Sequence, residues 1–352
     1  MATRAAAIDG ETLSDHSEKD KSWDKRKTQN EKVGAIYEKD KFFQRYALRM
    51  DACSKTLIFQ MAQHKTTGEV GLKLHKAQFC RVRNCPICQE RKAMTWTARF
   101  LKALPILEAM HPKARFLSLV ITVKNCDISN LRETIKEMNK AWGRFVKYDV
   151  FKKGMLGWAR TTEITHQSND KSIGDSHPHF HVLIMVNPTK LTDYYVRHSE
   201  WVAAWRKAAR LDYDPIVHVS VVKDKSKKDG KETSETETFG NTKLPRKAIS
   251  ETFKYSVKPS DMIQNNEWFL ELTRQIQQLH FVAVGGAIKE AIKEAESKSD
   301  GGGEEPTEED MLLKDGSTVR IDDLDRYYRW KTGPDGKKRR YYYWRSEPSI
   351  DP

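Results

Sequence analysis

The chain has no run of about 18 apolar residues, so its sequence argues against a membrane-spanning helix. Its N-terminus lacks the apolar core of a secretory signal, and only five of its 352 residues are cysteine, which excludes a disulfide-dense secreted protein. Acidic residues are the minority, because 49 Asp and Glu against 62 Lys and Arg leave a formal charge of +13. We therefore expect a cytoplasmic protein with no membrane partner that binds a polyanion, most simply nucleic acid.

Hydrophobic residues make up 38% of the chain, which is below the usual share and predicts a globular core accompanied by solvated segments. A disordered polar tail is expected over 1–40, a mobile low-complexity insert over 223–247 and a linker over 297–310. The remaining ranges are interpreted as a cysteine-bearing region over 41–100, a main domain over 101–296 and a small strand-rich appendix over 311–352.

Strand-like and helix-like patterns alternate between residues 113 and 223. The β-branched and aromatic content predicts buried strands over 114–123 and 179–186, and weaker patterns predict strands over 155–165 and 215–222. Apolar residues at helical spacing predict helices over 131–148 and 193–210, with helical patterning again, with breaks, over 247–296. Near the C-terminus, the turn signal GPDG between RYYRW and RRYYYWR predicts a hairpin.

Four of the five cysteines lie within 36 residues of one another, three of them in the segment FCRVRNCPIC. A cytoplasmic chain keeps such thiols reduced, so a disulfide framework is not expected. The CPIC spacing lets Cys85 and Cys88 meet one ion from a tight turn, and Cys53 and Cys80 would complete a closed tetrahedral zinc site.

Other interpretations of the cysteine region remain open. His64 or His75 could replace one of the more distant thiols, and the cysteines could instead be small buried side chains. Cys126 stands alone and is interpreted as a packing residue. The arginines and lysine around the cysteines favour a nucleic-acid-facing element over a redox CxxC; they are Arg81, Arg83, Arg91 and Lys92.

The segment SHPHFHVLIMV is the most informative stretch of the sequence. Alternate residues of a strand share a face, so His179 and His181 would point the same way and could chelate one divalent ion. Glu163, on the preceding predicted strand, is the candidate third ligand, and such a set leaves coordination positions open. His177 has the same parity, but Pro178 is expected to bend the chain before the strand. Taken alone, such a pair is more simply two strand histidines that hydrogen-bond or face solvent.

The segment AISETFKYSVKPSD predicts a helix over 248–261 that ends near Pro259. In that helix Glu251, Tyr255 and Lys258 would share one face. A tyrosine with a pKa of about 10 is only about 0.1% ionised at neutral pH, so it needs a nearby cation and a metal-polarised phosphate to act as a nucleophile. Without such neighbours, the segment is most simply an amphipathic helix with a charged pair.

Three segments occur together in one order: FLSLVITV, HPHFHVL and ETFKYSVK. In this order they resemble motifs one, two and three of the rolling-circle replication initiators of small bacterial plasmids, which belong to the HUH endonuclease superfamily. The segment LKLHKAQFCRVRNCPIC also resembles the zinc-binding region of one branch of that family, which uses a single tyrosine. The resemblance covers about residues 45–285.

The resemblance implies an α+β fold in which helices flank a central antiparallel sheet with the HUH strand near its middle. The N-terminal zinc-binding element and the strand-rich C-terminal appendix would be added to this fold. It also implies an activity: the protein would nick one strand of the plasmid origin, link a tyrosine to the 5′ phosphate and leave a free 3′ hydroxyl for the host polymerase.

The resemblance also implies roles for single residues. Tyr255 would be the nucleophile, assisted by Lys258, and Glu251 would activate the water that ends the cycle. Mg²⁺ or Mn²⁺ would be held by His179, His181 and Glu163. The tyrosine pairs 194–195 and 327–328 stand in no matching motif and are interpreted as packing or base-stacking residues.

The partner implied is origin DNA in single-stranded or cruciform form, together with a host helicase, a host polymerase and further copies of the chain. The segment 326–345 holds eight basic residues, one acidic residue and seven aromatics, which suits binding of single-stranded DNA. The alternative interpretation, with nearly equal support, is a small hairpin that packs on the main body of the protein. The candidate DNA contacts are Arg81, Arg83, Arg91, Lys254, Arg339 and Arg340.

Two other functions fit parts of the sequence. An HUH transposase or relaxase would use the same chemistry and would differ in genetic context. A zinc-dependent DNA-binding regulator without catalysis would form no covalent product with DNA.

Overall fold

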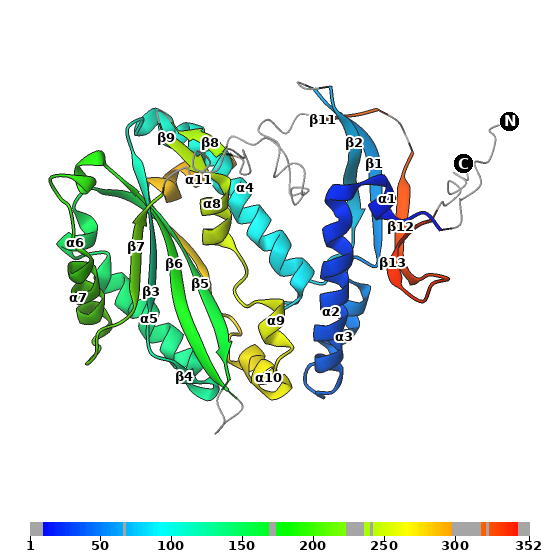
Figure 1. The fold of residues 1–352 in the computed structure, drawn as a ribbon, viewed down its shortest axis with the longest axis horizontal. Coiled ribbons are helices and arrows are strands. Elements are labelled where there is room, and N and C mark those ends of the chain that lie inside the picture. The colour runs from blue at the N-terminus through cyan, green and yellow to red at the C-terminus, as the bar shows by residue number, and fades with distance from the viewer. Residues whose placement is uncertain are drawn as a thin grey trace. The chain divides into compact units, whose positions relative to one another are not determined.

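The computed structural model describes residues 10–65, 68–168, 174–222, 236–239, 242–297, 318–321 and 324–343. The chain divides into two compact units, one formed by 1–91 with 305–352 and the other by 92–304. Each unit contains its own antiparallel sheet with helices beside it (Figure 1), so the predicted α+β class with antiparallel sheets and flanking helices is confirmed. No helix in the described part of the chain has the length and apolar character that a membrane crossing requires.

The sheet of the second unit has the strand order β10-β5-β6-β3-β7, with the short β4 beside β6. The histidine-bearing β6 therefore lies in the middle of the sheet, between β5 and β3. The four strands predicted between residues 113 and 223 are all present, whereas β10 lies in a region expected to be helical. The bounds are β3 (Arg115–Thr122), β4 (Cys126–Asp127), β5 (Met155–Gln167), β6 (Asp175–Val186), β7 (Val217–Val221) and β10 (Val282–Gly286).

Pro178 lies inside β6, not before it, so the expected bend is wrong. The pairing of β6 with β3 ends at His179, and its pairing with β4 is at Ser176 and Asp175. Pro178 falls in the gap between these two ladders, where a missing N–H removes no ladder bond on that side. The strand can therefore continue through His177.

Helices cover both faces of this sheet (Figure 1). On one face, Phe180, Val182 and Ile184 of β6 pack under α5, α6 and α7. On the other, Leu183 and Met185 pack under α4, α8 and α11. The helices of this unit are α4 (Pro86–Met110, from residue 92 onward), α5 (Leu131–Phe145), α6 (Asp149–Lys152), α7 (His198–Ala209), α8 (Arg246–Phe253), α9 (Pro259–Met262), α10 (Asn266–Gln275) and α11 (Ala287–Ser297), with short 3-10 turns η2 (Ile128–Asn130) and η3 (Pro188–Leu191).

The second of these faces changes character halfway along β6. Leu183 and Met185 belong to its apolar core, whereas His179 and His181 stand on the same face farther toward the start of the strand. Phe253, the last residue of α8, packs in that core against Phe100 of α4. The apolar cover of α8 therefore ends where the polar part of the face begins.

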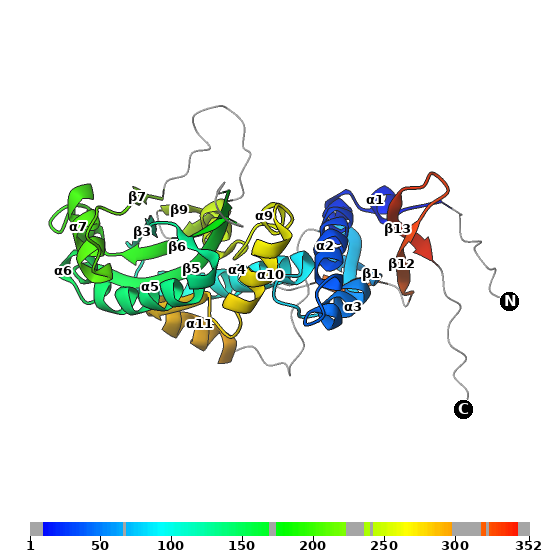
Figure 2. The same cartoon turned by 90° about the horizontal axis from the view of Figure 1, so that it is seen from below.

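In the first unit, β1 (Thr56–His64) pairs with β2 (Val70–Ala77) and with β12 (Arg326–Thr332), and β12 forms a hairpin with β13 (Lys338–Tyr343). The predicted hairpin is thus confirmed, and it extends the N-terminal sheet, which also includes β11 (Thr318–Arg320). The turned view shows α2 (Ser22–Glu38) beside these strands (Figure 2), and the unit also contains α1 (Leu13–His16), η1 (Glu18–Lys21) and α3 (Gln44–Ala52).

For the described residues, the prediction of a disordered tail over 1–40 is wrong. Trp23, Val33 and Tyr37 of α2 are buried, and Trp23 stacks on Phe79 at 6.3 Å between ring centroids. A few large apolar residues among many charges are enough to fix this helix once partners distant in the sequence cover them. Residues 1–9, most of the 223–247 insert and the 298–310 part of the predicted linker lie outside the described residues, while β8 (Thr236–Phe239) and β9 (Thr242–Pro245) pair with each other.

Candidate metal centres and tyrosine segment

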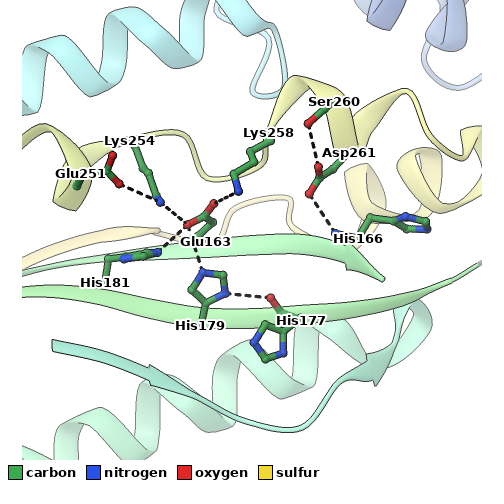
Figure 3. Close-up of polar contacts among 10 residues, drawn as sticks. All are labelled: Glu163, His166, His177, His179, His181, Glu251, Lys254, Lys258, Ser260 and Asp261. Carbon is green, nitrogen blue, oxygen red and sulfur yellow. Dashed lines mark hydrogen bonds and ion pairs between the residues drawn. The ribbon is translucent and has the colours of Figure 1, made fainter. Parts of the chain in front are cut away.

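Strand register brings the predicted histidine and carboxylate ligands together on one face of the sheet. Glu163 of β5 lies opposite His179 of β6, and His181 is two residues farther along on the same side. The Oε2 atom of Glu163 is 3.2 Å from His179 Nε2 and 2.6 Å from His181 Nε2. Figure 3 shows these three side chains converging above the two strands. This arrangement is preformed by the backbone, because neighbouring strands fix the positions of all three residues.

The Glu163 side chain is only 2% exposed, whereas those of His179 and His181 are 12% and 19% exposed. Burial by itself would raise the pKa of the Glu163 carboxyl, but hydrogen bonds with both imidazoles and the charge of Lys254 outweigh it and hold this pKa far below its ordinary value. Burial also lowers the pKa of His181, although its hydrogen bond with Glu163 opposes the shift. The cluster therefore offers a carboxylate and, at His181, an imidazole biased toward its neutral, metal-binding form.

A hydrogen bond on the far side of the ring fixes the orientation of His179. His179 Nδ1 lies 3.2 Å from the backbone oxygen of His177, which can only accept, so this nitrogen carries the proton. Nε2, which faces Glu163 at 3.2 Å, is the ring nitrogen that would bind an ion once it gives up the proton that it shares with the carboxylate. The His177 ring itself is held by Asn125, at 2.8 Å between Nδ1 and Oδ1.

The donor set fits a divalent cation. Glu163 Oε1 is buried and accepts no hydrogen bond from the residues that the structure describes. The ligand atoms of the three residues all lie within 4.8 Å of one another. Neighbouring ligands of an octahedral ion with bonds of about 2.1 Å are about 3 Å apart, close to the two measured contacts. Glu163, His179 and His181 can thus hold one ion while leaving its solvent side open.

The segment around Tyr255 is not the continuous helix that the sequence predicts. The helix α8 ends at Phe253, and residues 254–258 run alongside β5, where Ile164 N donates to Ser256 O at 2.8 Å and Ile164 forms a parallel bridge with Val257. Pairing with the strand outweighs local helical propensity. Glu251 and Tyr255 therefore do not share a helical face, since Glu251 lies in the last turn of α8 and Tyr255 lies beyond the end of that helix.

This segment lies directly at the metal-binding cluster (Figure 3). Lys254 Nζ is 3.1 Å from Glu163 Oε2, and Lys258 Nζ is 3.6 Å from Glu163 Oε1. Tyr255 is half-buried and lies in the chain between these two lysines. Glu251 is linked to the same group, because its Oε2 is 3.2 Å from Lys254 Nζ. A tyrosine, two ammonium groups and a carboxylate thus come from one short stretch beside the candidate metal ligands.

Sequence reasoning missed the contacts that hold this stretch at the end of β5. Asp261 of α9 is buried; its Oδ2 accepts from the His166 backbone N–H at 3.2 Å and its Oδ1 from Ser260 Oγ at 3.0 Å. The His166 ring is 2.8 Å from Gln264 Oε1. The only sequence signal was an acidic residue in the first turn after Pro259, a common start of a helix.

The structure also brings the four predicted cysteines together. Their Sγ atoms all lie within 4.8 Å of one another, and the closest pairs are 3.6, 3.7 and 3.8 Å apart. A tetrahedral zinc ion with Zn–S bonds of about 2.3 Å has sulfur–sulfur edges of about 3.8 Å, which these distances match. His75, the alternative ligand, is exposed and outside the cluster, and the side chain of His64 is outside the described residues. The cluster consists of Cys53, Cys80, Cys85 and Cys88.

Buried polar groups surround the cysteine cluster. Lys27, which is 1% exposed, donates to the backbone oxygens of Met50, Asp51 and Cys53 at 3.2, 2.7 and 2.9 Å. Burial lowers the pKa of this lysine. Asn30 Nδ2 lies 3.2 Å from Cys85 Sγ. No sequence pattern indicated these contacts, because both residues lie in the stretch that was expected to be disordered.

The predicted DNA contacts lie in different environments. Arg340 is fully buried, bonded to Asp24 at 2.9 Å and to Ser54, so its prediction as a DNA contact is wrong and it serves packing of the first unit. Arg91 covers the Phe79 ring at 3.8 Å, and Arg339 pairs with Asp335. Arg81 is exposed and Arg83 half-buried. Of the tyrosine pairs, Tyr194 and Tyr195 are exposed, whereas Tyr328 is buried beside half-buried Tyr327.

Comparison with known proteins gives a consistent result. A family model described as "Replication protein" matches residues 71–342. A protein named "Protein rep" from Lentilactobacillus hilgardii is 30% identical over 335 residues, which cover 93% of this chain and 96% of that protein. Another "Protein rep", from Lactiplantibacillus plantarum, is 31% identical and covers 76% of this chain and 80% of its own length. A "Replication protein" from Staphylococcus aureus is 33% identical over 190 residues, covering 52% of this chain and 74% of that protein. No solved structure matches the chain.

Proposed function

Because the chain belongs to the replication-protein family of plasmid rolling-circle initiators, we propose that it nicks one strand of its origin DNA through Tyr255. The observation that carries this proposal is that Lys254 and Lys258, which flank Tyr255 in the chain, both contact the Glu163 carboxylate of the cluster formed with His179 and His181. Nicking chemistry needs the metal cluster and the tyrosine at one phosphate.

In the proposed reaction, the phenol oxygen of Tyr255 attacks the scissile phosphorus. The new bond joins this oxygen to the 5′ phosphate, and the bond from phosphorus to the 3′ oxygen breaks. The tyrosine proton leaves and the departing 3′ oxygen gains one, so a free 3′ hydroxyl remains to prime synthesis. The phosphodiester is conserved as a phosphotyrosine link, so later strand transfer needs no ATP.

The residues around the tyrosine would divide the remaining work. A Mg²⁺ or Mn²⁺ ion bound by Glu163, His179 and His181 would polarise the phosphate and offset its charge. Lys258, whose side chain is half exposed, would bind the scissile phosphate or the ionising phenol. Glu251, more than half exposed, would activate the water that releases the strand at the end of the cycle.

The cysteine cluster would hold a structural zinc ion. Four thiolates around one Zn²⁺ leave a net charge of −2, and the hydrogen bonds of buried Lys27 all end on uncharged oxygens. A zinc tetrathiolate would supply the negative charge that a buried ammonium requires. We propose that this first unit contributes to recognition of the origin, and that a host helicase, a host polymerase and further copies of the chain act with it.

The test is formation of a covalent protein–DNA product. The full protein is incubated with Mn²⁺ and labelled single-stranded oligonucleotides that tile the DNA around its gene, and the products are separated on a denaturing gel. We expect one oligonucleotide to yield its 3′-side fragment joined to the protein through its 5′ phosphate, and its 5′-side fragment with a free 3′ hydroxyl, with the linkage mapped to the peptide that contains Tyr255. The substitution Tyr255→Phe should abolish the adduct, and Tyr195→Phe, at an exposed tyrosine in no motif, should retain it.

An adduct that persists in Tyr255→Phe would show that another residue is the nucleophile. If the wild-type protein binds the oligonucleotides but forms no adduct with any of them, the non-catalytic regulator becomes the better account. The position of the nick relative to an origin, a transposon end or a transfer origin separates the initiator from a transposase or relaxase.

A further inference from the structure

One contact in the candidate metal site has no role in the chemistry proposed above. Glu163 Oε2, the carboxylate oxygen shared by both imidazoles, also lies 3.1 Å from Lys254 Nζ. A divalent ion held by the three ligands would need this same oxygen. Lys254 therefore occupies part of the space and neutralises part of the charge that the ion would use (Figure 3).

Lys254 and a bound divalent ion would repel each other at such short distances, because the Glu163 carboxylate that both would contact is almost fully buried. The Lys254 side chain is 26% exposed, and Glu163 is almost fully buried. Both charges act on one carboxylate oxygen, so each weakens the binding of the other. The ammonium and the ion are competitors for Glu163.

A second carboxylate is already in place to receive Lys254. Glu251 Oε2 lies 3.2 Å from Lys254 Nζ, and the Glu251 side chain is 56% exposed. Lys254 can leave Glu163 without losing its ion pair. Lys258 does not contact the oxygen that both imidazoles share. Its Nζ lies 3.6 Å from the other oxygen, Glu163 Oε1, and its side chain is half exposed.

We propose that Lys254 is a placeholder cation, which stabilises Glu163 while the site holds no divalent ion and is transferred to Glu251 when the ion binds. This inference rests on the proposed metal site. Its consequence is an order of events: loading of the ion releases an ammonium group directly beside Tyr255 in the chain, where the phosphate of the DNA strand would bind. The buried carboxylate of Glu163 is thus neutralised in both states of the protein, by Lys254 before the ion binds and by the ion afterwards.

The first experiment measures Mn²⁺ affinity in the absence of DNA, by the free-ion signal in electron paramagnetic resonance and by calorimetry. The full protein is compared with Lys254→Met, Lys254→Arg and, as a matched control, Lys247→Met at an exposed lysine of the preceding helix α8. We expect Lys254→Met to bind Mn²⁺ about tenfold more tightly or better, because a competing charge is removed. Lys254→Arg should bind no more tightly than wild type, and Lys247→Met should match it.

A second experiment uses the unmodified chain, so it does not depend on the folding of a variant. Amine-reactive labelling followed by mass spectrometry measures the reaction rate of Lys254 with and without Mn²⁺. We expect Mn²⁺ to accelerate labelling of Lys254 several-fold and to leave Lys247 unchanged. Magnesium should act in the same way at higher concentration.

The outcomes separate the two proposals. If wild type binds Mn²⁺ but Lys254→Met binds it equally or more weakly, and labelling of Lys254 does not respond to the ion, the placeholder role is wrong while the metal site stands. If neither wild type nor Lys254→Met binds Mn²⁺, the metal site itself is wrong and the placeholder role fails with it. Tighter binding by Lys254→Met together with ion-dependent labelling supports both.

Discussion

The two clusters of candidate metal ligands are built in opposite ways. The four cysteines come from the end of α3, the segment after β2 and the start of α4, so no regular ladder fixes them relative to one another. The ligands Glu163, His179 and His181 stand on two adjacent strands whose register positions them. One site has four ligands, three of them buried, and the other has three ligands, of which both imidazoles are partly exposed. The first resembles a closed structural site and the second an open catalytic one.

This difference in construction predicts opposite responses to loss of the ion. Four thiols that converge from loops and helix ends need the metal to hold them together, so metal and fold of the first unit should be lost together. The strand site should keep its geometry without an ion, because backbone hydrogen bonds and the Lys254 contact already stabilise it. Removing a cysteine ligand should therefore impair folding of the first unit, whereas removing a ligand of the strand site should impair catalysis and leave the fold intact.

The largest expected effect follows from Cys85→Ser. Structural zinc contributes about 10–16 kcal/mol to small zinc-binding peptides, as much as or more than the total stability of about 5–15 kcal/mol of a typical domain. We expect metal analysis to find no zinc in the purified variant. We also expect limited proteolysis to show that its first unit no longer folds cooperatively and is cleaved readily. The control is Cys126→Ser, at a half-buried thiol outside the cluster. A Cys85→Ser protein that keeps full zinc and wild-type protease resistance would remove Cys85 from the ligand set.

A smaller effect, confined to chemistry, is expected for His179→Ala. Loss of one metal ligand should slow Mn²⁺-dependent cleavage of origin DNA by about 100-fold to 1,000-fold, or about 3–4 kcal/mol in the barrier. Zinc content and thermal unfolding should stay at wild-type values, and DNA binding should be retained. His218→Ala is the matched control, since His218 is an exposed histidine on the same face of the sheet, two strands away. Unchanged cleavage in His179→Ala would mean that the imidazole binds no catalytic ion.

The contrast also explains which parts of the molecule can be predicted from sequence. Parity along β6 placed His179 and His181 on one face, and the preceding strand supplied Glu163, because strand pairing between sequence neighbours follows simple rules. The CxxC spacing paired Cys85 with Cys88, and the nearby thiols of Cys53 and Cys80 were added to them, with His64 or His75 left open as a substitute. Features set by short-range regularity were therefore predicted correctly.

Features set by distant contacts were not. The helix was expected to continue to Pro259, but Ser256 and Val257 pair with Ile164 of β5 instead. Local helical propensity contains no information about that pairing. Lys27 looked like part of a solvated stretch, yet it is buried against carbonyl groups 23 to 26 residues later in the chain. Arg340 looked like a DNA contact and instead bonds Ser54, 286 residues away.

The smallest effect on cleavage is expected for His177→Ala, which tests whether His177 belongs to the ligand set of the strand site. His177 shares the face of His179, and their ring centroids are 5.3 Å apart, so it is the nearest candidate for a further ligand. The atom of His177 that orients His179 is its backbone oxygen, which His177→Ala retains. We therefore expect cleavage to slow by less than about tenfold. Asn125→Ala, which removes the hydrogen bond between Asn125 and the His177 ring, should have a similarly small effect. If cleavage slowed as much in His177→Ala as in His179→Ala, His177 would be a third imidazole ligand of the ion. The strand site would then have four protein ligands, like the cysteine cluster, and would not be the more open of the two.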